Sequence, residues 1–176
     1  MNIRSAQARD LEACVALDPS YETDYVWQLE TTRNNDAVAV IFRETRLPRT
    51  MRVLAAPSRE LALEHFERDE CFLVAEEEGA ICAFLDLTAE AWRQLAWINQ
   101  LTVAPEHRRH GLGSALLRAG LDWARDRGLS TVMAETRTKN HPASALFQKH
   151  GFVFCGFNER YYSNRDIAVF FALALR

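Results

Sequence analysis

The sequence predicts an α/β (α+β) fold in which one mixed sheet is covered by helices. Residues 71–103 hold three consecutive strand-like segments, a pattern typical of an antiparallel meander. A strand, helix, strand, helix, strand order then runs from residue 95 to the C-terminus. No internal repeat, low-complexity tract or Pro/Gly/Ser-rich linker interrupts the 176 residues, so we expect a single domain over residues 1–176.

The N-terminal third is predicted to hold a helix, a hairpin and a second helix. Residues 7–17 place apolar side chains at helical spacing. Segments 25–33 and 37–46 are rich in β-branched and aromatic residues, and the Asn-Asn-Asp between them favours a hairpin. Residues 58–69 predict the second helix, with Ser58 as its N-cap.

The meander consists of strands at 71–78, 80–87 and 95–103, with a turn at Gly79. A long amphipathic helix follows from about Ser114, and a glycine marks its end.

The last part is predicted to hold a strand, a helix and two further strands. The strands lie at 130–137, 152–157 and 167–175, and the helix at 142–150 has Pro142 in its first turn. Because the chain opens with meanders, we expect the sheet to be mostly antiparallel with flanking helices.

Composition and charge exclude several classes of function. The net charge of −3 argues against a general nucleic-acid binder. The longest apolar run, IAVFFALAL, is shorter than the ~20 residues of a membrane helix, and the N-terminus does not resemble a signal peptide. No metal-site spacing is present. The cysteines are expected to be buried free thiols in a reducing cytoplasm; they are Cys14, Cys71, Cys82 and Cys155.

The stretch APEHRRHGLG (104–113) joins a strand ending at Val103 to the long helix. Glycines let a backbone approach an anion closely, and the free amides and dipole of a helix N-terminus attract its charge. Arg108 and Arg109 would add charge-assisted contacts. The alternative is a simple bend between a strand and a helix. The loop is neither a nucleotide P-loop, since no Gly-Lys-Ser/Thr follows, nor a dinucleotide fingerprint, since Leu116 replaces the third glycine.

This region resembles the acyl-CoA-binding segment of the GNAT superfamily of N-acetyltransferases. Arg108, Gly111 and Gly113 match the pattern Arg/Gln-x-x-Gly-x-Gly/Ala. The family's second segment, Asn-x-x-Ala-x-x-x-Tyr-x-x-x-Gly-Phe, is matched at Asn140, Ala143, Gly151 and Phe152. Over nearly the whole chain the sequence also resembles the streptothricin acetyltransferases, and its C-terminal part resembles the ribosomal-protein alanine acetyltransferases.

The resemblance implies a binding mode for acetyl-CoA. The strand before the loop would splay from its neighbour and admit the acetyl-pantetheine arm, while the loop amides hold the pyrophosphate. The implied binding residues are Leu101, Val103, Arg108, Arg109, His110, Gly111, Gly113, Ser114, Asn140 and Phe147.

Transfer of the acetyl group to an amine requires positioning and a proton acceptor. Glu135 is our candidate for the base, because alternation in VMAETR sets it on the face opposite Val132 and Ala134. The alanine acetyltransferases that the chain resembles have a glutamate base at this position. The alternative is a Glu135 that pairs with Arg137 or is solvated.

The family's tyrosine, which can protonate the departing thiolate, is replaced by Phe147. Tyr161 or Tyr162 in the ERYY segment could supply the acid, with Tyr162 our candidate, or both tyrosines could pack at the pocket rim. Asn99 and Gln100 could position a water. His65 lies on a helix, where a solvated or capping role is the default.

We therefore expect an acetyl-CoA-dependent N-acetyltransferase acting on a primary amine, such as that of a cationic streptothricin-type antibiotic. A protein N-terminal or lysine acetyltransferase and a catalytically silent acyl-CoA-binding sensor are the alternatives. No nucleic-acid or membrane partner is expected. A homodimer is compatible with the sequence.

Overall fold

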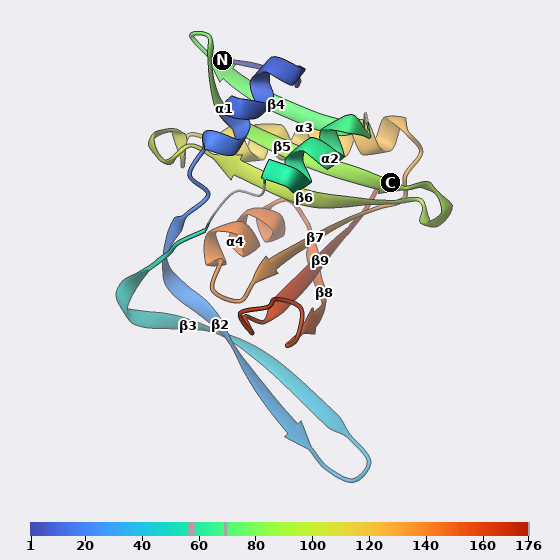
Figure 1. Cartoon of the computed structure of the whole chain (residues 1–176). Helices are drawn as coiled ribbons and strands as arrows, with labels where there is room; N and C mark the ends of the chain where they lie inside the picture. Colours follow the sequence, from blue (N-terminus) through green and yellow to red (C-terminus); the bar gives the residue numbers. More distant parts are fainter. Residues whose placement is uncertain (56–58, 69, 176) are drawn as a thin grey trace.

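A computed structural model describes residues 1–55, 59–68 and 70–175 (Figure 1). The strands are β1 (Asn2–Ser5), β2 (Tyr21–Arg33), β3 (Val38–Val53), β4 (Cys71–Glu77), β5 (Ala80–Glu90), β6 (Leu95–Val103), β7 (Thr131–Arg137), β8 (Val153–Asn158) and β9 (Ala168–Ala174). The helices are α1 (Leu11–Ala16), α2 (Arg59–Glu67), α3 (Leu112–Asp126) and α4 (His141–Lys149).

Within the described residues, seven strands form the central sheet in the order β1-β4-β5-β6-β7-β9-β8, and β2 and β3 form a separate hairpin. Strands β6 and β7 run parallel, while the other neighbouring pairs described in the sheet are antiparallel. This confirms the predicted mixed, mostly antiparallel sheet. Sequence analysis missed β1, a four-residue edge strand that owes its place to its pairing with β4.

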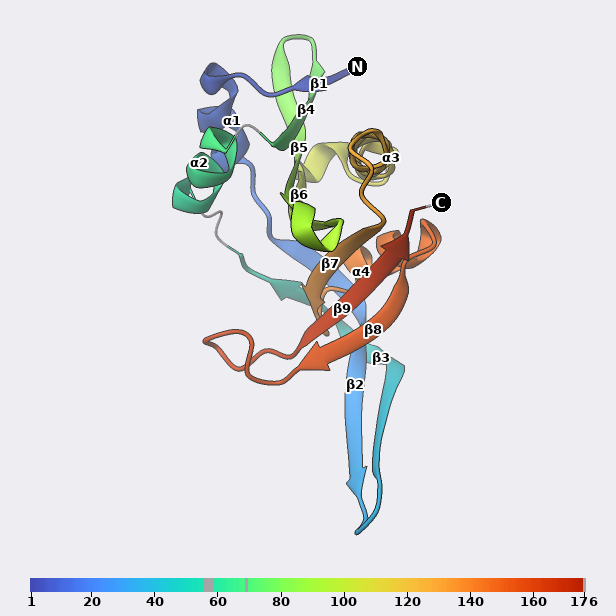
Figure 2. The ribbon, with the colours of Figure 1, turned by 90° about the vertical axis from the view of Figure 1, so that its right-hand side faces the viewer.

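Helices cover both faces of the sheet: α1 and α2 lie on one side, and α3 and α4 on the other (Figure 2). On the α3 side, the packing is close enough that a Cβ on Gly120 would lie 2.6 Å from Leu85 Cδ2 and 2.9 Å from Leu87 Cδ1. Since side chains alternate along a strand, Phe84 and Asp86 point to the other face. There Phe84 packs in the apolar cluster under α1 and α2.

The boundaries of α3 follow local backbone signals. The helix begins at Leu112, two residues before the predicted start, because Gly111 takes φ +88° as its N-cap. Gly128, with φ +69°, follows the last turn as predicted for a C′ glycine. The predicted N-cap Ser58 lies outside the described residues. Three cysteines are buried as expected, whereas Cys155 is exposed.

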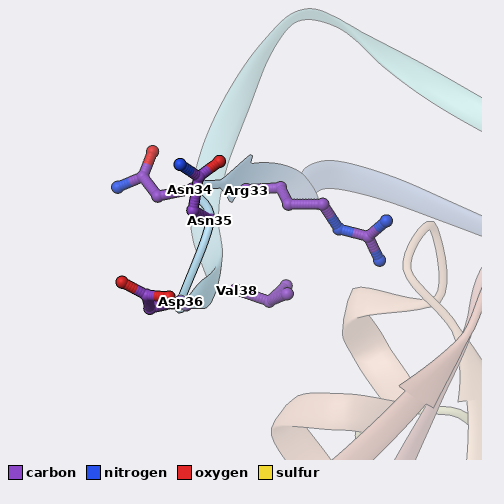
Figure 3. Close-up of a pocket in the computed structure, with 6 residues that line it drawn as sticks. Arg33, Asn34, Asn35, Asp36 and Val38 are labelled. Atoms are coloured by element: carbon purple, nitrogen blue, oxygen red, sulfur yellow. The ribbon is translucent and has the colours of Figure 1, made fainter.

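The β2–β3 hairpin packs on the body through its inner half. Trp27 and Phe42 contact Phe154 of β8, with ring centroids 5.9 and 5.2 Å apart. The outer half projects away from the sheet in both views (Figures 1 and 2). Residues 33–38 line a hollow at its tip. Figure 3 shows the Arg33 side chain pointing away from those of Asn34 and Asp36, so these side chains do not converge on a ligand.

In the described ranges, no helix has the length and apolar character needed to cross a membrane. The same residues contain no group of three His, Cys, Asp or Glu side chains placed to hold a metal ion.

Candidate active site

A gap opens in the sheet where β6 and β7 part. Their parallel pairing runs from Leu95 opposite Thr131 to Ile98 opposite Ala134 and then ends, although both strands continue. Over residues 99–103, the edge of β6 that faced β7 therefore has no β7 ladder partner. Leu101 and Val103 lie on this stretch, where the strand is expected to separate from its neighbour. Residues 99–102 can meet an extended ligand along this edge, whereas the Val103 carbonyl accepts from Arg108 Nε.

The glycine loop leads from β6 into α3. Arg109 and Gly111 both adopt positive φ, at +67° and +88°. A Cβ built on Gly111 would meet nothing within 4 Å, so the space in front of the helix is open. No side chain of the described residues caps α3, which leaves first-turn N–H groups for a ligand. This open, uncapped helix end suits the pyrophosphate of acetyl-CoA, because the amides and the helix dipole both favour an anion.

Gly113 permits close packing behind the loop. A Cβ at this position would lie 3.5 Å from Leu146 Cδ2 and 3.7 Å from Val103 Cγ2, which are ordinary contacts. The structure therefore explains why glycine or alanine suits this position, whereas Gly111 needs its positive φ. Ser114 follows in the first turn of α3.

The Arg108 side chain binds protein carbonyls. Its guanidinium donates to the carbonyl oxygens of Val103, Ser20 and Asp18, at 2.8, 2.6 and 2.7 Å. Arg108 thus joins the segment before β2 to the end of β6. Arg109 and His110 are exposed beside the open helix end, so their side chains, unlike that of Arg108, are available to a ligand there.

Replacing Arg108 with Ala is expected to lower the free energy of unfolding by roughly 1–3 kcal/mol, because charge-assisted hydrogen bonds to three carbonyls are lost. Arg109→Ala is the matched control: it removes the same charge from the neighbouring exposed residue and should leave the melting temperature nearly unchanged. Thermal unfolding without ligand measures both. Equal stability of the two variants would contradict the bridging role.

Glu135 is the first residue of β7 beyond its pairing with β6, at the mouth of the gap. The Tyr162 hydroxyl donates a hydrogen bond to Glu135 Oε1 at 2.9 Å. The other oxygen, Oε2, is buried and has no hydrogen-bond partner among the described residues. The alternative pairing with Arg137 is not formed. Arg137 Nε instead lies 3.5 Å from Asp166 Oδ2, and its guanidinium stacks 4.6 Å from the Tyr162 ring centroid.

The two tyrosines of the β8–β9 loop remain protonated at neutral pH. Burial, and then the Glu135 carboxylate, raise the pKa of Tyr162 above its ordinary value. The same causes raise the pKa of Tyr161 to about 12. The Tyr161 ring packs edge-on against Tyr162, 5.2 Å between centroids. A hollow beside Tyr162 is also lined by Glu159, Arg160 and Arg165.

These tyrosines reach the site from the α1 and α2 side of the sheet. Figure 2 shows the β8–β9 loop extending on that side, opposite α3 and α4. Glu135 and Phe170 are paired across β7 and β9, and Phe170 contacts both Trp97 and Tyr161. Glu135 therefore shares this face of the sheet with the tyrosines.

The second motif has a structural role in this chain. Asn140 caps α4, since its side-chain oxygen accepts from the Ala143 amide at 3.2 Å. Phe147 is buried, with its ring centroid 5.5 Å from that of Phe152 and 6.0 Å from that of Phe171. Position 147 thus carries no proton donor.

Sequence analysis did not find a buried pair formed between α2 and β5. His65, expected to be solvated or capping, is buried and lies 2.5 Å from Asp86, through Nδ1 and Oδ2. The available signal was a lone carboxylate in the otherwise apolar strand AICAFLDL. Asp86 is 1% exposed, and burial raises its pKa.

Comparison with known proteins identifies the family. The model of the acetyltransferase (GNAT) family matches residues 38–152. A streptothricin acetyltransferase of Streptomyces lavendulae is 30% identical over 160 residues, which are 90% of this chain and 85% of the relative. Ribosomal protein bS18-alanine N-acetyltransferases are also similar.

Two solved structures share the fold. A nourseothricin acetyltransferase, 26% identical, covers 98% of this chain and 97% of its own with a TM-score of 0.83. A putative streptothricin acetyltransferase of Bacillus anthracis str. Ames, in complex with acetyl coenzyme A, is 22% identical, with coverages of 99% and 97% and a TM-score of 0.78. The chain is a member of the GNAT family, an N-acetyltransferase that uses acetyl-CoA as its acetyl donor.

Proposed function

We propose that the acceptor is a primary amine of a cationic small molecule of the streptothricin class. The free, buried Oε2 of Glu135 at the mouth of the gap carries this proposal, because a carboxylate there attracts an ammonium group and can take its proton. The similarity to a streptothricin acetyltransferase over 90% of the chain supports the choice of acceptor. The free cysteines fit an enzyme of the reducing cytoplasm.

In the proposed reaction, bound acetyl-CoA supplies the activated acetyl thioester. The bound ammonium first releases one proton to solvent and becomes a neutral amine. Glu135 Oε2 accepts a second proton from the amine, whose nitrogen forms the new bond to the carbonyl carbon as the carbon–sulfur bond breaks. Tyr162 holds Oε1 and so orients the carboxylate. Once the carboxyl group turns so that this proton faces Tyr162, the proton can pass through the Tyr162 hydroxyl toward the departing sulfur, which leaves both side chains in their starting states.

The acceptor proposal is tested with a panel of amines and acetyl-CoA, with released thiol as the readout. Streptothricin-type antibiotics, polyamines and peptides with free N-termini represent the alternatives. We expect the highest kcat/KM for the antibiotic. A clear preference for the peptides would replace this proposal with protein N-terminal acetylation.

Tyr162→Phe is expected to lower kcat by about 10- to 100-fold, because it removes a hydrogen bond to a charged carboxylate and the proposed route for the proton. Tyr161→Phe is the companion variant, since it removes the neighbouring phenol, whose pKa Glu135 also raises, and leaves the 2.9 Å hydrogen bond from Tyr162 to Oε1 in place. Steady-state rates and acetyl-CoA affinity should be measured for both. If Tyr162→Phe keeps full activity, the tyrosine only packs at the pocket rim.

A further inference from the structure

Strand β6 carries a β-bulge at the point where the gap opens. Leu87 of β5 pairs with Ile98, and Asp86 pairs with Gln100, so Asn99 is an extra residue without a partner on β5. Asn99 is also the first residue of β6 beyond its last pair with β7. A bulge changes which backbone groups face each edge of a strand. The position of this bulge therefore decides which N–H and C=O groups of β6 line the gap.

The side chain of Asn99 fixes the bulge to β5. Its Nδ2 lies 3.3 Å from Asp86 Oδ1 and 3.2 Å from Thr88 Oγ1, and both oxygens accept from it. The other carboxylate oxygen, Asp86 Oδ2, lies 2.5 Å from His65 Nδ1 on α2. A continuous chain of hydrogen bonds thus runs from α2 through β5 to the bulge.

Stability alone gives little reason for a buried polar pair at this position. Burying a carboxylate is costly, and well-packed apolar residues in place of a buried ion pair are often neutral or stabilising. Asp86 is 1% exposed and His65 is 8% exposed, and they lie on the same face of the sheet as Phe84. The pair instead fixes the orientation of the Asp86 carboxylate. His65 contacts one of its oxygens, and the other oxygen accepts from Asn99.

We infer that His65 and Asp86 are positioning residues for acetyl transfer, which act by holding the Asn99 side chain and so pinning the bulge. With the bulge pinned, the backbone of β6 keeps its alignment along the gap, across from Glu135 on β7. The inference rests on the acetyl transfer that the family assigns to this chain. Small displacements of groups that orient a reacting bond reduce rates strongly.

Three variants test the inference. His65→Leu/Asp86→Leu removes the whole pair, and Asp86→Asn removes the charge but keeps an oxygen that accepts from Asn99 Nδ2. Asn99→Ala removes the held side chain and leaves the buried pair intact, in case the double variant does not fold. The readouts are kcat by thiol release, acetyl-CoA affinity by thermal shift, and hydrogen exchange of the backbone amides of residues 99–103.

We expect the double variant and Asn99→Ala to lose about 10- to 100-fold in kcat. Acetyl-CoA affinity should fall by less than kcat, since the glycine loop still binds the ligand while the misaligned β6 edge contributes less. Amide exchange at residues 99–103 should become faster in both. Asp86→Asn should keep most of the wild-type kcat, and its amides at residues 99–103 should exchange as slowly as in wild type, since it preserves the hydrogen bond to Asn99.

Full activity and unchanged exchange in the double variant, or in Asn99→Ala, would overturn the inference. An Asp86→Asn variant as impaired as the double variant would overturn it as well, since charge and not position would then matter. Failure of the assigned reaction is distinguishable, because the wild-type protein would then release no thiol with any amine.

Discussion

Replacing Glu135 with Gln is expected to lower kcat by roughly 10²–10⁴, the range for loss of a principal general base. The substitution keeps the shape of the side chain and an oxygen that accepts from Tyr162, but it removes the proton acceptor at Oε2. Acetyl-CoA affinity should hardly change, because the glycine loop and the edge of β6 do not depend on this carboxylate. Thiol release under saturating amine and thermal shift with acetyl-CoA measure the two quantities.

The matched control is Glu30→Gln, which makes the same chemical change on the exposed hairpin. Glu30 forms a surface ion pair with Arg43, and such pairs contribute little to stability. This variant should keep wild-type kinetics. A Glu135→Gln variant with full activity and an unaltered pH–rate profile would show that another group accepts the amine proton.

The parts of the site that the sequence predicts are those encoded locally. The glycine loop is recognisable because two glycines and a basic flank fall within ten consecutive residues between a strand and a helix. Glu135 stands out because side chains alternate along a strand, so three neighbours suffice to set its face. The overall sheet follows in the same way from the order of strand and helix signals.

The remainder depends on contacts between distant segments. Tyr162 reaches Glu135 across 27 residues, and Arg108 reaches the carbonyls of Ser20 and Asp18 across 88 and 90. The sequence places Arg108 beside an anion site, but only the fold brings the carbonyls that engage it. In the sequence, His65 is an ordinary histidine of a predicted helix. Its partner Asp86 is brought beside it only when α2 packs on the sheet. Packing between elements, which no local pattern encodes, decides each of these partners.

Gly111→Asp is expected to abolish most of the stabilisation that acetyl-CoA gives to the folded protein. At about a hundred times its dissociation constant, a ligand stabilises the native state by roughly 2.7 kcal/mol. An aspartate at the N-cap of α3 would place a carboxylate where the pyrophosphate is proposed to bind. Its side chain fits, since a Cβ at position 111 meets nothing within 4 Å. The repulsion between like charges should therefore be the main effect on binding.

Gly111→Asn is the control that isolates this charge. Asn and Asp are nearly identical in size, and both tolerate the positive φ of +88° better than other non-glycine residues. The two variants should lose similar amounts of thermal stability without ligand, because the backbone strain is shared. Only the aspartate variant should lose most of the acetyl-CoA-induced shift in melting temperature. If it folds and retains the full shift, the pyrophosphate binds elsewhere. If both variants lose the shift equally, the loop conformation and not the charge controls binding.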